Sequence, residues 1–215
     1  DPVNGAPKAV IDAAGITDMR TGAVTAIGAK HLAPEKPRIL GHIGARGTAY
    51  WNVRLLDHLF DFEEIRVHSR RPESREPFGE RLSQDLGKPV IVTEDWESCL
   101  KDADIMVEAS RLREPTPMFD PAWVKPGALV IPYGTMSSLP LEFVDGIDAF
   151  FMDDRGQMNA GDFGALRPHI QAGKVTRDSF QAEIGEVAAG AKPGRKSADE
   201  TILFWHRGLA TSDIA

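Results

Sequence analysis

The residues best suited to chemistry in this sequence lie in two short segments. The first, ILGHIGARGTAY, is an apolar run that breaks into a glycine turn and then a helical pattern. The second, VHSRR, is a strand-like run that ends in Ser69, Arg70 and Arg71. A glycine turn between a strand and a helix is typical of the first βαβ unit of a dinucleotide-binding domain, where backbone amides approach a diphosphate. The sequence therefore predicts a nucleotide site over residues 44–47.

The glycine turn departs from the usual spacing. Read from Gly44 as G-x-G-x-x-A, it has Ala45 followed by Arg46 in place of the second glycine, which normally lets the backbone come close to the diphosphate. Read as G-x-x-G, it keeps a flexible residue at Gly47. Arg46 would either pair with a phosphate oxygen or obstruct the site, and we favour the pairing because guanidinium groups bind phosphate well. A tight turn in an α/β domain with some other ligand is the alternative.

The end of the second strand normally lies beside the adenosine ribose. An acidic residue there would accept hydrogen bonds from the free 2′-hydroxyl of NAD, whereas Ser69, Arg70 and Arg71 suit the 2′-phosphate of NADP. The alternative is that these arginines are simply solvated at a strand end. We expect NADP as the cofactor, with NAD as the second choice.

Other polar residues give weaker indications. Asp153 and Asp154 follow an apolar run and could do acid–base work, although such a pair more often caps an element. His206 is the best single candidate for a proton donor, and no histidines show metal-ligand spacing. Glu183 and Glu186 would share a helix face. We therefore predict no metal site and assign no catalytic acid from these residues alone.

Composition restricts the class of protein. The 215 residues carry a formal charge of −7 with both signs interspersed, which argues against a nucleic-acid partner. The lone cysteine, Cys99, cannot form an internal disulfide and is expected to be buried. No run reaches the length of a membrane span, and the first residues lack a signal-peptide layout. These features favour a cytoplasmic protein, and the absence of an initiator methionine suggests a piece of a longer one.

Strand-like and helical segments alternate along the chain. This alternation predicts a doubly wound, Rossmann-type α/β fold with a parallel sheet. A helix should start at Thr17 or Asp18 and run to about residue 33, rich in Gly and Ala so that it packs closely on a neighbour. Further helices are expected after Gly47, at 78–86, around Cys99, and at 166–172 and 179–189. The expected strands are residues 9–12, 38–43, 65–69, 90–93, 104–109, 128–132, 149–152 and 201–205.

Several motifs in order make the chain resemble the ornithine cyclodeaminase/mu-crystallin family over nearly all of its length. They are DMRTGAVTAIGAKHLA, the glycine turn, the SRR strand end, ADIMVEAS, WVKPGALVIPYG, and AEIGEVAAGAKPGR leading into ETILF and GLATSDIA. Each motif is modest alone, and their order and spacing give the resemblance its specificity.

The resemblance implies a Rossmann domain that binds NAD or NADP and part of a second domain that forms a homodimer and holds the substrate. Residues 35–195 would form the first domain, while 1–34 (a strand and a helix) and 196–215 would belong to the second. By the same resemblance, Arg20 lies near substrate and cofactor, and Thr21, Ser110 and Gly134 line the cofactor.

Two departures from the family pattern bear on activity. The cyclodeaminases carry a catalytic aspartate where this chain has Met136, and a thioether cannot act as a base. The family's N-terminal substrate-binding segment, with its lysine, has no counterpart here. We therefore expect an NADP-dependent oxidoreductase acting on a C=N or C–NH bond of a small amino or imino acid. A non-catalytic NADPH-binding protein similar to mu-crystallin, or a subunit that needs a partner, is the alternative, and ornithine cyclodeamination is less favoured.

Overall fold

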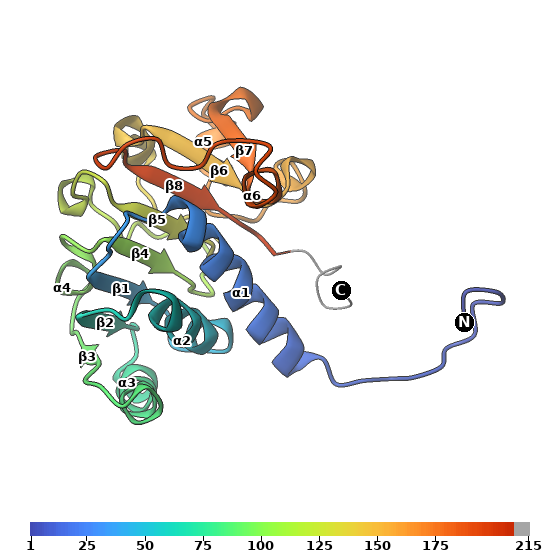
Figure 1. The fold of residues 1–215 in the computed structure, drawn as a ribbon, viewed down its shortest axis with the longest axis horizontal. Coiled ribbons are helices and arrows are strands. Elements are labelled where there is room, and N and C mark those ends of the chain that lie inside the picture. The colour runs from blue at the N-terminus through green and yellow to red at the C-terminus, as the bar shows by residue number, and fades with distance from the viewer. Residues whose placement is uncertain (209–215) are drawn as a thin grey trace.

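The computed structural model describes residues 1–208, which form one parallel β-sheet covered by helices on both faces (Figure 1). The strand order is β3-β2-β1-β4-β5-β8-β6-β7, and every neighbouring pair of strands in this sheet is parallel. This confirms the predicted doubly wound α/β fold. The strands are β1 (Ile39–Ile43), β2 (Glu64–His68), β3 (Ile91–Val92), β4 (Ile105–Glu108), β5 (Leu129–Pro132), β6 (Ala149–Met152), β7 (Phe180–Glu183) and β8 (Ile202–Trp205).

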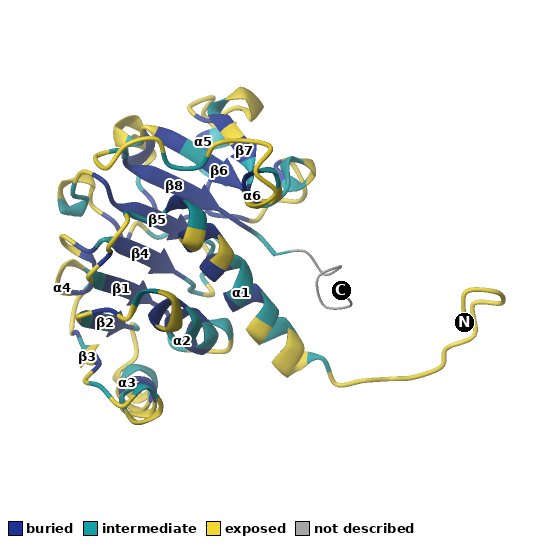
Figure 2. Cartoon of the chain, in the orientation of Figure 1, coloured by how far each residue is buried: buried dark blue, intermediate teal, exposed yellow. Residues whose placement is uncertain are grey.

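Two apolar clusters, one on each face of the sheet, hold the helices in place. The first joins the strands to α1, α2, α3 and α6, and the second joins them to α4 and the loops that follow β4 and β5. β4 and β5 are buried throughout because both of their faces are covered, which explains why their sequences are apolar except for Glu108 at the end of β4 (Figure 2). The helices are α1 (Ala14–Leu32), α2 (Thr48–Phe60), α3 (Pro72–Leu86), α4 (Trp96–Leu100), α5 (Arg167–Gln171) and α6 (Ile184–Ala188).

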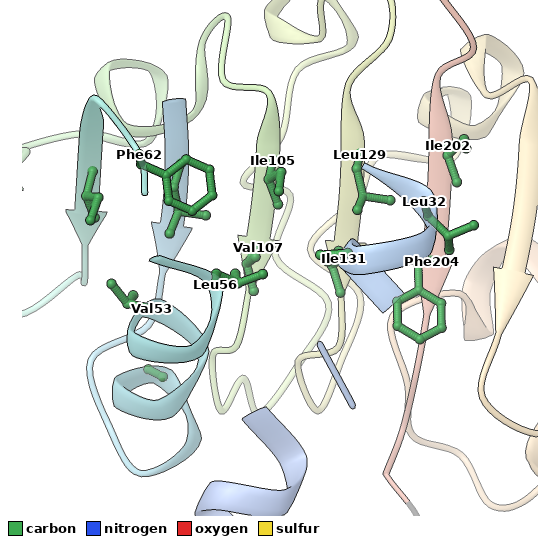
Figure 3. Packing of buried hydrophobic residues seen from close by; sticks show 14 of the residues in the cluster. Leu32, Val53, Leu56, Phe62, Ile105, Val107, Leu129, Ile131, Ile202 and Phe204 are labelled. Atoms are coloured by element: carbon green, nitrogen blue, oxygen red, sulfur yellow. The ribbon is translucent and has the colours of Figure 1, made fainter. Parts of the chain in front are cut away.

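Packing on the sheet face that α1 and α2 cover fixes α2, the helix that follows the glycine turn. Val53 and Leu56 of α2 are fully buried and point toward the sheet, where Ile105 and Val107 of β4 lie (Figure 3). On the same face, Leu32 of α1 packs beside the neighbouring strands (Figure 3). Burying such side chains contributes roughly 1.5–3 kcal/mol each, so the start of α2 is held rigidly above the sheet edge.

The glycines of α1 allow the close packing that the sequence predicts. A Cβ atom added at Gly22 would lie 2.7 Å from Cβ of Trp51 in α2, and one added at Gly28 would collide with the ring of Phe204 in β8. α1 therefore lies directly against both α2 and the sheet, which places its N-terminal half beside the glycine turn.

The expected strand at residues 9–12 is wrong. These residues are exposed, and the N-terminal segment extends away from the sheet (Figures 1 and 2). A short apolar run forms a strand only where a neighbour can pair with its backbone, and residues 1–208 supply none here. The helix also starts earlier than predicted, at Ala14, whose N–H donates to Asp12 Oδ1 at 3.0 Å.

The expected helix at residues 179–189 is a strand followed by a helix. Phe180 and Ala182 of β7 are buried while Gln181 is exposed, which is the period-two pattern of a strand. Glu183 and Glu186 do not share a helix face: they form the capping box that starts α6. The helix-favouring residues after position 183 hid the short edge strand before them.

The last described strand lies inside the sheet. β8 pairs with β5 and with β6, so residues 202–205 belong to the same sheet as residues 39–183. No break in the sheet marks the predicted boundary at residue 196, and the division of the chain into two domains stays a prediction.

Candidate functional site

The glycine turn lies at the carboxyl edge of the sheet, where the chain leaves β1 toward β2 on one side and leaves the neighbouring β4 toward β5 on the other. Gly44 and Gly47 both have positive φ, 115° and 47°, which favours glycine. The Gly44 N–H donates to the carbonyl of His68 at 2.9 Å, and a Cβ on Gly44 would lie 3.0 Å from the carbonyl of Ala109. The turn therefore sits tightly at the switch point between β1 and β4, where open parallel sheets bind their ligands.

Helix α2 starts directly after this turn. Gly47 provides no side-chain cap and the first turn of α2 contains no acidic residue. The N–H groups of Ala49 and Tyr50 donate to the carbonyls of Arg46 and Gly47 at 2.9 and 3.3 Å. A cavity of about 310 Å³ adjoins the turn, lined by Asp18, Ala45, Gly47, Tyr50, Trp51, Phe78 and Arg81. Arg46 is exposed at the tip of the turn. The structure thus places Ala45 and Gly47 against this cavity, where a Cβ on Gly47 would lie 2.7 Å from the carboxylate of Asp18.

The end of β2 lies next to the turn. His68 is buried, and its Nδ1 lies 2.9 Å from the carbonyl of Thr93, which fixes the strand end. Ser69 is half-buried, and Arg70 and Arg71 are exposed. Within residues 1–208, neither arginine side chain makes a hydrogen bond or an ion pair with protein, so both guanidinium groups are available to an outside anion.

A buried carboxylate joins the ends of β4 and β5, and sequence analysis missed it. Glu108 accepts hydrogen bonds from the Ser110 N–H at 2.5 Å and from the Ser138 hydroxyl at 3.0 Å. A Cβ on Gly134 would collide with its carboxylate. Burial raises the pKa of Glu108 to about 7, against which its hydrogen bonds act. The expected cofactor-lining residues Ser110 and Gly134 thus meet around one buried acid; an acidic residue inside the apolar run DIMVEA was the available indication.

Tyr133 connects the glycine turn to the end of the described chain, and it was also missed. Its hydroxyl donates to Thr48 Oγ1 at 2.9 Å, and its ring stacks on His206 with centroids 4.4 Å apart. A polar aromatic residue directly after a buried strand, in IPYG, is the sequence feature that could have identified it. Tyr133 therefore links the first residue of α2 to the segment after β8.

Arg20 and Thr21 lie beside the segment after β8. A Cβ on Gly208 would lie 2.5 Å from a guanidinium nitrogen of Arg20, and Thr21 is buried with its hydroxyl donating to the carbonyl of Thr17 at 2.7 Å. Arg20 is half-buried at this place. The structure thus brings these two predicted residues to Gly208, and the charge of Arg20 acts on His206.

His206 is poorly suited to donate a proton. It is fully buried, its Nε2 lies 2.9 Å from Thr25 Oγ1, and its ring stacks between those of Tyr133 and Phe204. Burial, assisted by the charge of Arg20, lowers the pKa of His206 to about 3. The ring is neutral near pH 7 and packs as part of the core.

The remaining candidate residues, Asp153, Asp154 and Cys99, bond to the backbone or lie in the core. Asp153 accepts hydrogen bonds from the N–H groups of Arg207 and Gly208 at 2.8 and 2.9 Å, and burial raises its pKa. Asp154 caps the short helix that follows. Cys99 is fully buried in α4, and burial raises the pKa of its thiol to about 12.

No cluster of three or more His, Cys, Asp and Glu side chains within residues 1–208 is arranged to hold a metal ion. None of the helices in this part of the chain has the length and apolar character needed to span a membrane.

Comparisons with known proteins give the chain its relatives. Its sequence is 30% identical to an alanine dehydrogenase of Archaeoglobus fulgidus over 219 aligned positions, covering 100% of this chain and 65% of the relative. It is 31% identical to a ketimine reductase mu-crystallin of Rattus norvegicus, covering 100% and 64%. The chain thus spans about two thirds of the length of the curated relatives it matches.

Solved structures of related proteins have the same fold as this chain. The fold matches that of the Thermococcus litoralis Δ1-pyrroline-2-carboxylate reductase, solved with NADH and L-proline, with a TM-score of 0.90 and 28% identity over 99% of this chain and 66% of that one. It matches an archaeal alanine dehydrogenase dimer with bound NAD at a TM-score of 0.87 and 29% identity, covering 100% and 66%. The model of one family matches residues 1–215. The chain belongs to the ornithine cyclodeaminase/mu-crystallin family.

Proposed function

We propose that this chain forms the nucleotide-binding part of an NADP-dependent oxidoreductase that acts on a C=N or C–NH bond of a small amino or imino acid. The glycine turn at the switch point of the sheet carries this proposal, because Gly44 and Gly47 give it the positive-φ backbone of a tight turn between a strand and a helix. The names of its relatives support the reaction class: pyrroline-2-carboxylate reductase, alanine dehydrogenase and ketimine reductase.

The residues that we propose for the cofactor surround that turn. Residues 44–47 and the start of α2 would hold the diphosphate, and Ser69, Arg70 and Arg71 would hold the 2′-phosphate. Thr21, Ser110 and Gly134 would line the remaining cofactor. Arg20 would bind a substrate carboxylate or a cofactor phosphate, since its guanidinium is half-buried beside Gly208.

The chemistry itself would come from the nicotinamide, which supplies or accepts a hydride when bound. The protein's part is to position the two partners and to exclude water. Because burial keeps His206 neutral, we do not assign it the role of proton donor.

We further propose a homodimer in the cytoplasm. The outer side of α1 carries Ile16, Met19 and Ile27, which are 45%, 47% and 44% exposed and would be covered by further protein. One structural relative is a dimer. The lone buried thiol of Cys99 is consistent with a reducing compartment.

A non-catalytic NADPH-binding protein is the second candidate, favoured by Met136 in place of an acid and by the neutral His206. NADPH oxidation by the full-length protein, measured with cyclic imines and with 2-oxo acids plus amines, separates the two. Turnover of any of these supports the oxidoreductase. Tight NADPH binding without turnover supports the binding protein, and proline and ammonia formed from ornithine would contradict both.

A further inference from the structure

A row of hydrogen-bonded side chains runs beneath the glycine turn and ends at the first residue of α2. It starts at His42 of β1, whose Nε2 lies 3.1 Å from Asn52 Nδ2 in α2. The same amide nitrogen bonds the hydroxyl of Tyr133, and Tyr133 in turn bonds Thr48 Oγ1 at 2.9 Å. His42 and Asn52 are fully buried, so water does not compete for these bonds.

The direction of these bonds follows from the chemistry of the groups. The amide nitrogen of Asn52 can only donate, so it gives one proton to His42 Nε2 and the other to the Tyr133 oxygen. In the observed orientation the carbonyl oxygen of Asn52 and the Nδ1–H of His42 lack a hydrogen-bond partner, whereas rotating the amide by 180° would leave both N–H groups of Asn52 unpaired in a buried place. The acceptor role of His42 agrees with burial lowering its pKa to about 4, which keeps the ring neutral.

The row therefore fixes the role of Thr48. Because the Tyr133 oxygen accepts from Asn52, the single Tyr133 proton goes to Thr48 Oγ1. The Thr48 oxygen is then an acceptor toward Tyr133, and its own proton must point elsewhere. Within residues 1–208 that proton has no hydrogen-bonded protein acceptor. Thr48 is half-buried and directly follows Gly47 of the glycine turn.

We propose that the Thr48 hydroxyl donates a hydrogen bond to a phosphate oxygen of the bound dinucleotide, and that Asn52 and Tyr133 are positioning residues that hold it in this donor orientation. This inference rests on the proposed function, because it requires a diphosphate over the turn. A donor already fixed by its neighbours loses little freedom on binding, and a bond to a charged oxygen is stronger than one to a neutral group.

The test uses two ligands and two variants. Thr48→Val removes the hydroxyl and keeps the shape, while Thr48→Ser keeps the hydroxyl and serves as the matched control. NADPH contains the diphosphate, whereas adenosine 2′-monophosphate contains the adenosine and 2′-phosphate without it. Dissociation constants for both ligands would be measured by calorimetry or ligand-observed NMR on the full-length protein.

Thr48→Val should weaken NADPH binding about 10-fold or more and leave adenosine 2′-monophosphate binding unchanged, while Thr48→Ser should bind both like the wild type. Tyr133→Phe should weaken NADPH binding by a smaller factor, because the hydroxyl stays but loses its fixed orientation. NADPH affinity unchanged by Thr48→Val would overturn the inference, and so would equal weakening of both ligands, which would indicate local distortion. A wild-type protein that binds neither NADPH nor NADH would instead contradict the proposed function.

Discussion

The hydroxyl of Ser138 donates to the carboxylate of Glu108 at 3.0 Å, and neither side chain reaches solvent. This bond ties the end of β4 to the loop that follows β5 and carries Gly134. A carboxylate in such a place resists ionisation, and burial raises the pKa of Glu108 to about 7 from the usual 4.5. The loops that we assign to the cofactor are thus held by an acid that titrates near neutral pH.

Replacing Glu108 should change how stability depends on pH. Between about pH 4.5 and 7 the folded state holds a proton on Glu108 that the unfolded chain has released, so the free energy of unfolding falls as pH rises through this window. Glu108→Gln removes this contribution. The difference in free energy of unfolding between wild type and Glu108→Gln should therefore change by on the order of 3 kcal/mol between about pH 4.5 and 7. Urea denaturation at several pH values measures it.

Ser138→Ala provides the companion measurement for Glu108. It removes a donor to the ionised carboxylate, so the pKa of Glu108 should rise further and the pH-dependent loss of stability should extend above pH 7. If the difference in free energy of unfolding between wild type and Glu108→Gln stays constant across this pH window, the raised pKa of Glu108 is refuted.

Arg70 and Arg71 should select the coenzyme. Their side chains are exposed, and replacing both with Ala should weaken NADPH binding by about 10-fold or more while leaving NADH affinity nearly unchanged, because only NADPH carries the 2′-phosphate. Fluorescence titration of both coenzymes measures this. Arg177→Ala, an exposed arginine before the amino end of β7, is the control and should change neither affinity. Equal loss for NADH and NADPH would count against a specific phosphate contact.

Arg46 should assist phosphate binding. It is exposed at the tip of the turn, so Arg46→Ala should weaken binding of both coenzymes by about 5–10-fold, with a smaller loss at high salt because exposed charges are screened. Titrations at two salt concentrations give this result directly. If affinity instead rises when the side chain is removed, Arg46 obstructs the site.

Gly28 should be irreplaceable within α1. A Cβ there collides with the ring of Phe204, so Gly28→Ala should destabilise the fold by about 1–3 kcal/mol. Gly15→Ala, in the same helix with nothing within 4 Å of the added atom, is the matched control and should be neutral or slightly stabilising. Thermal unfolding of both variants measures the contrast, and equal stability of the two would mean that α1 does not pack on the sheet at Gly28.

Sequence patterns predicted the strands that the sheet buries on both faces. The strands β1, β4, β5 and β6 were predicted to within about one residue because each is a continuous apolar run that the sheet buries on both faces. The short edge strand β7 was missed because half of its residues face solvent and a helix follows at once. Residues 9–12 show the opposite error, since apolar character cannot form a strand without a partner.

The residues of the candidate site also fall into those that the sequence predicted and those that it missed. Residues 44–47 and the SRR segment were found because local spacing defines a turn and a strand end. Glu108, Tyr133 and Thr48 were missed because their roles depend on contacts between β4, β5 and α2, which lie far apart in the sequence. His206 was overvalued as an acid because its burial cannot be read from its neighbours along the chain.

We propose that a dinucleotide lies across the carboxyl edge of the sheet, with its diphosphate over the glycine turn. A crystal of the full-length protein soaked in NADPH tests this most directly. We expect density for the diphosphate beside Gly47 and Thr48 and for the 2′-phosphate between Arg70 and Arg71. Density for NADPH elsewhere on the protein, or protein side chains filling the space over the turn in the bound crystal, would contradict the account.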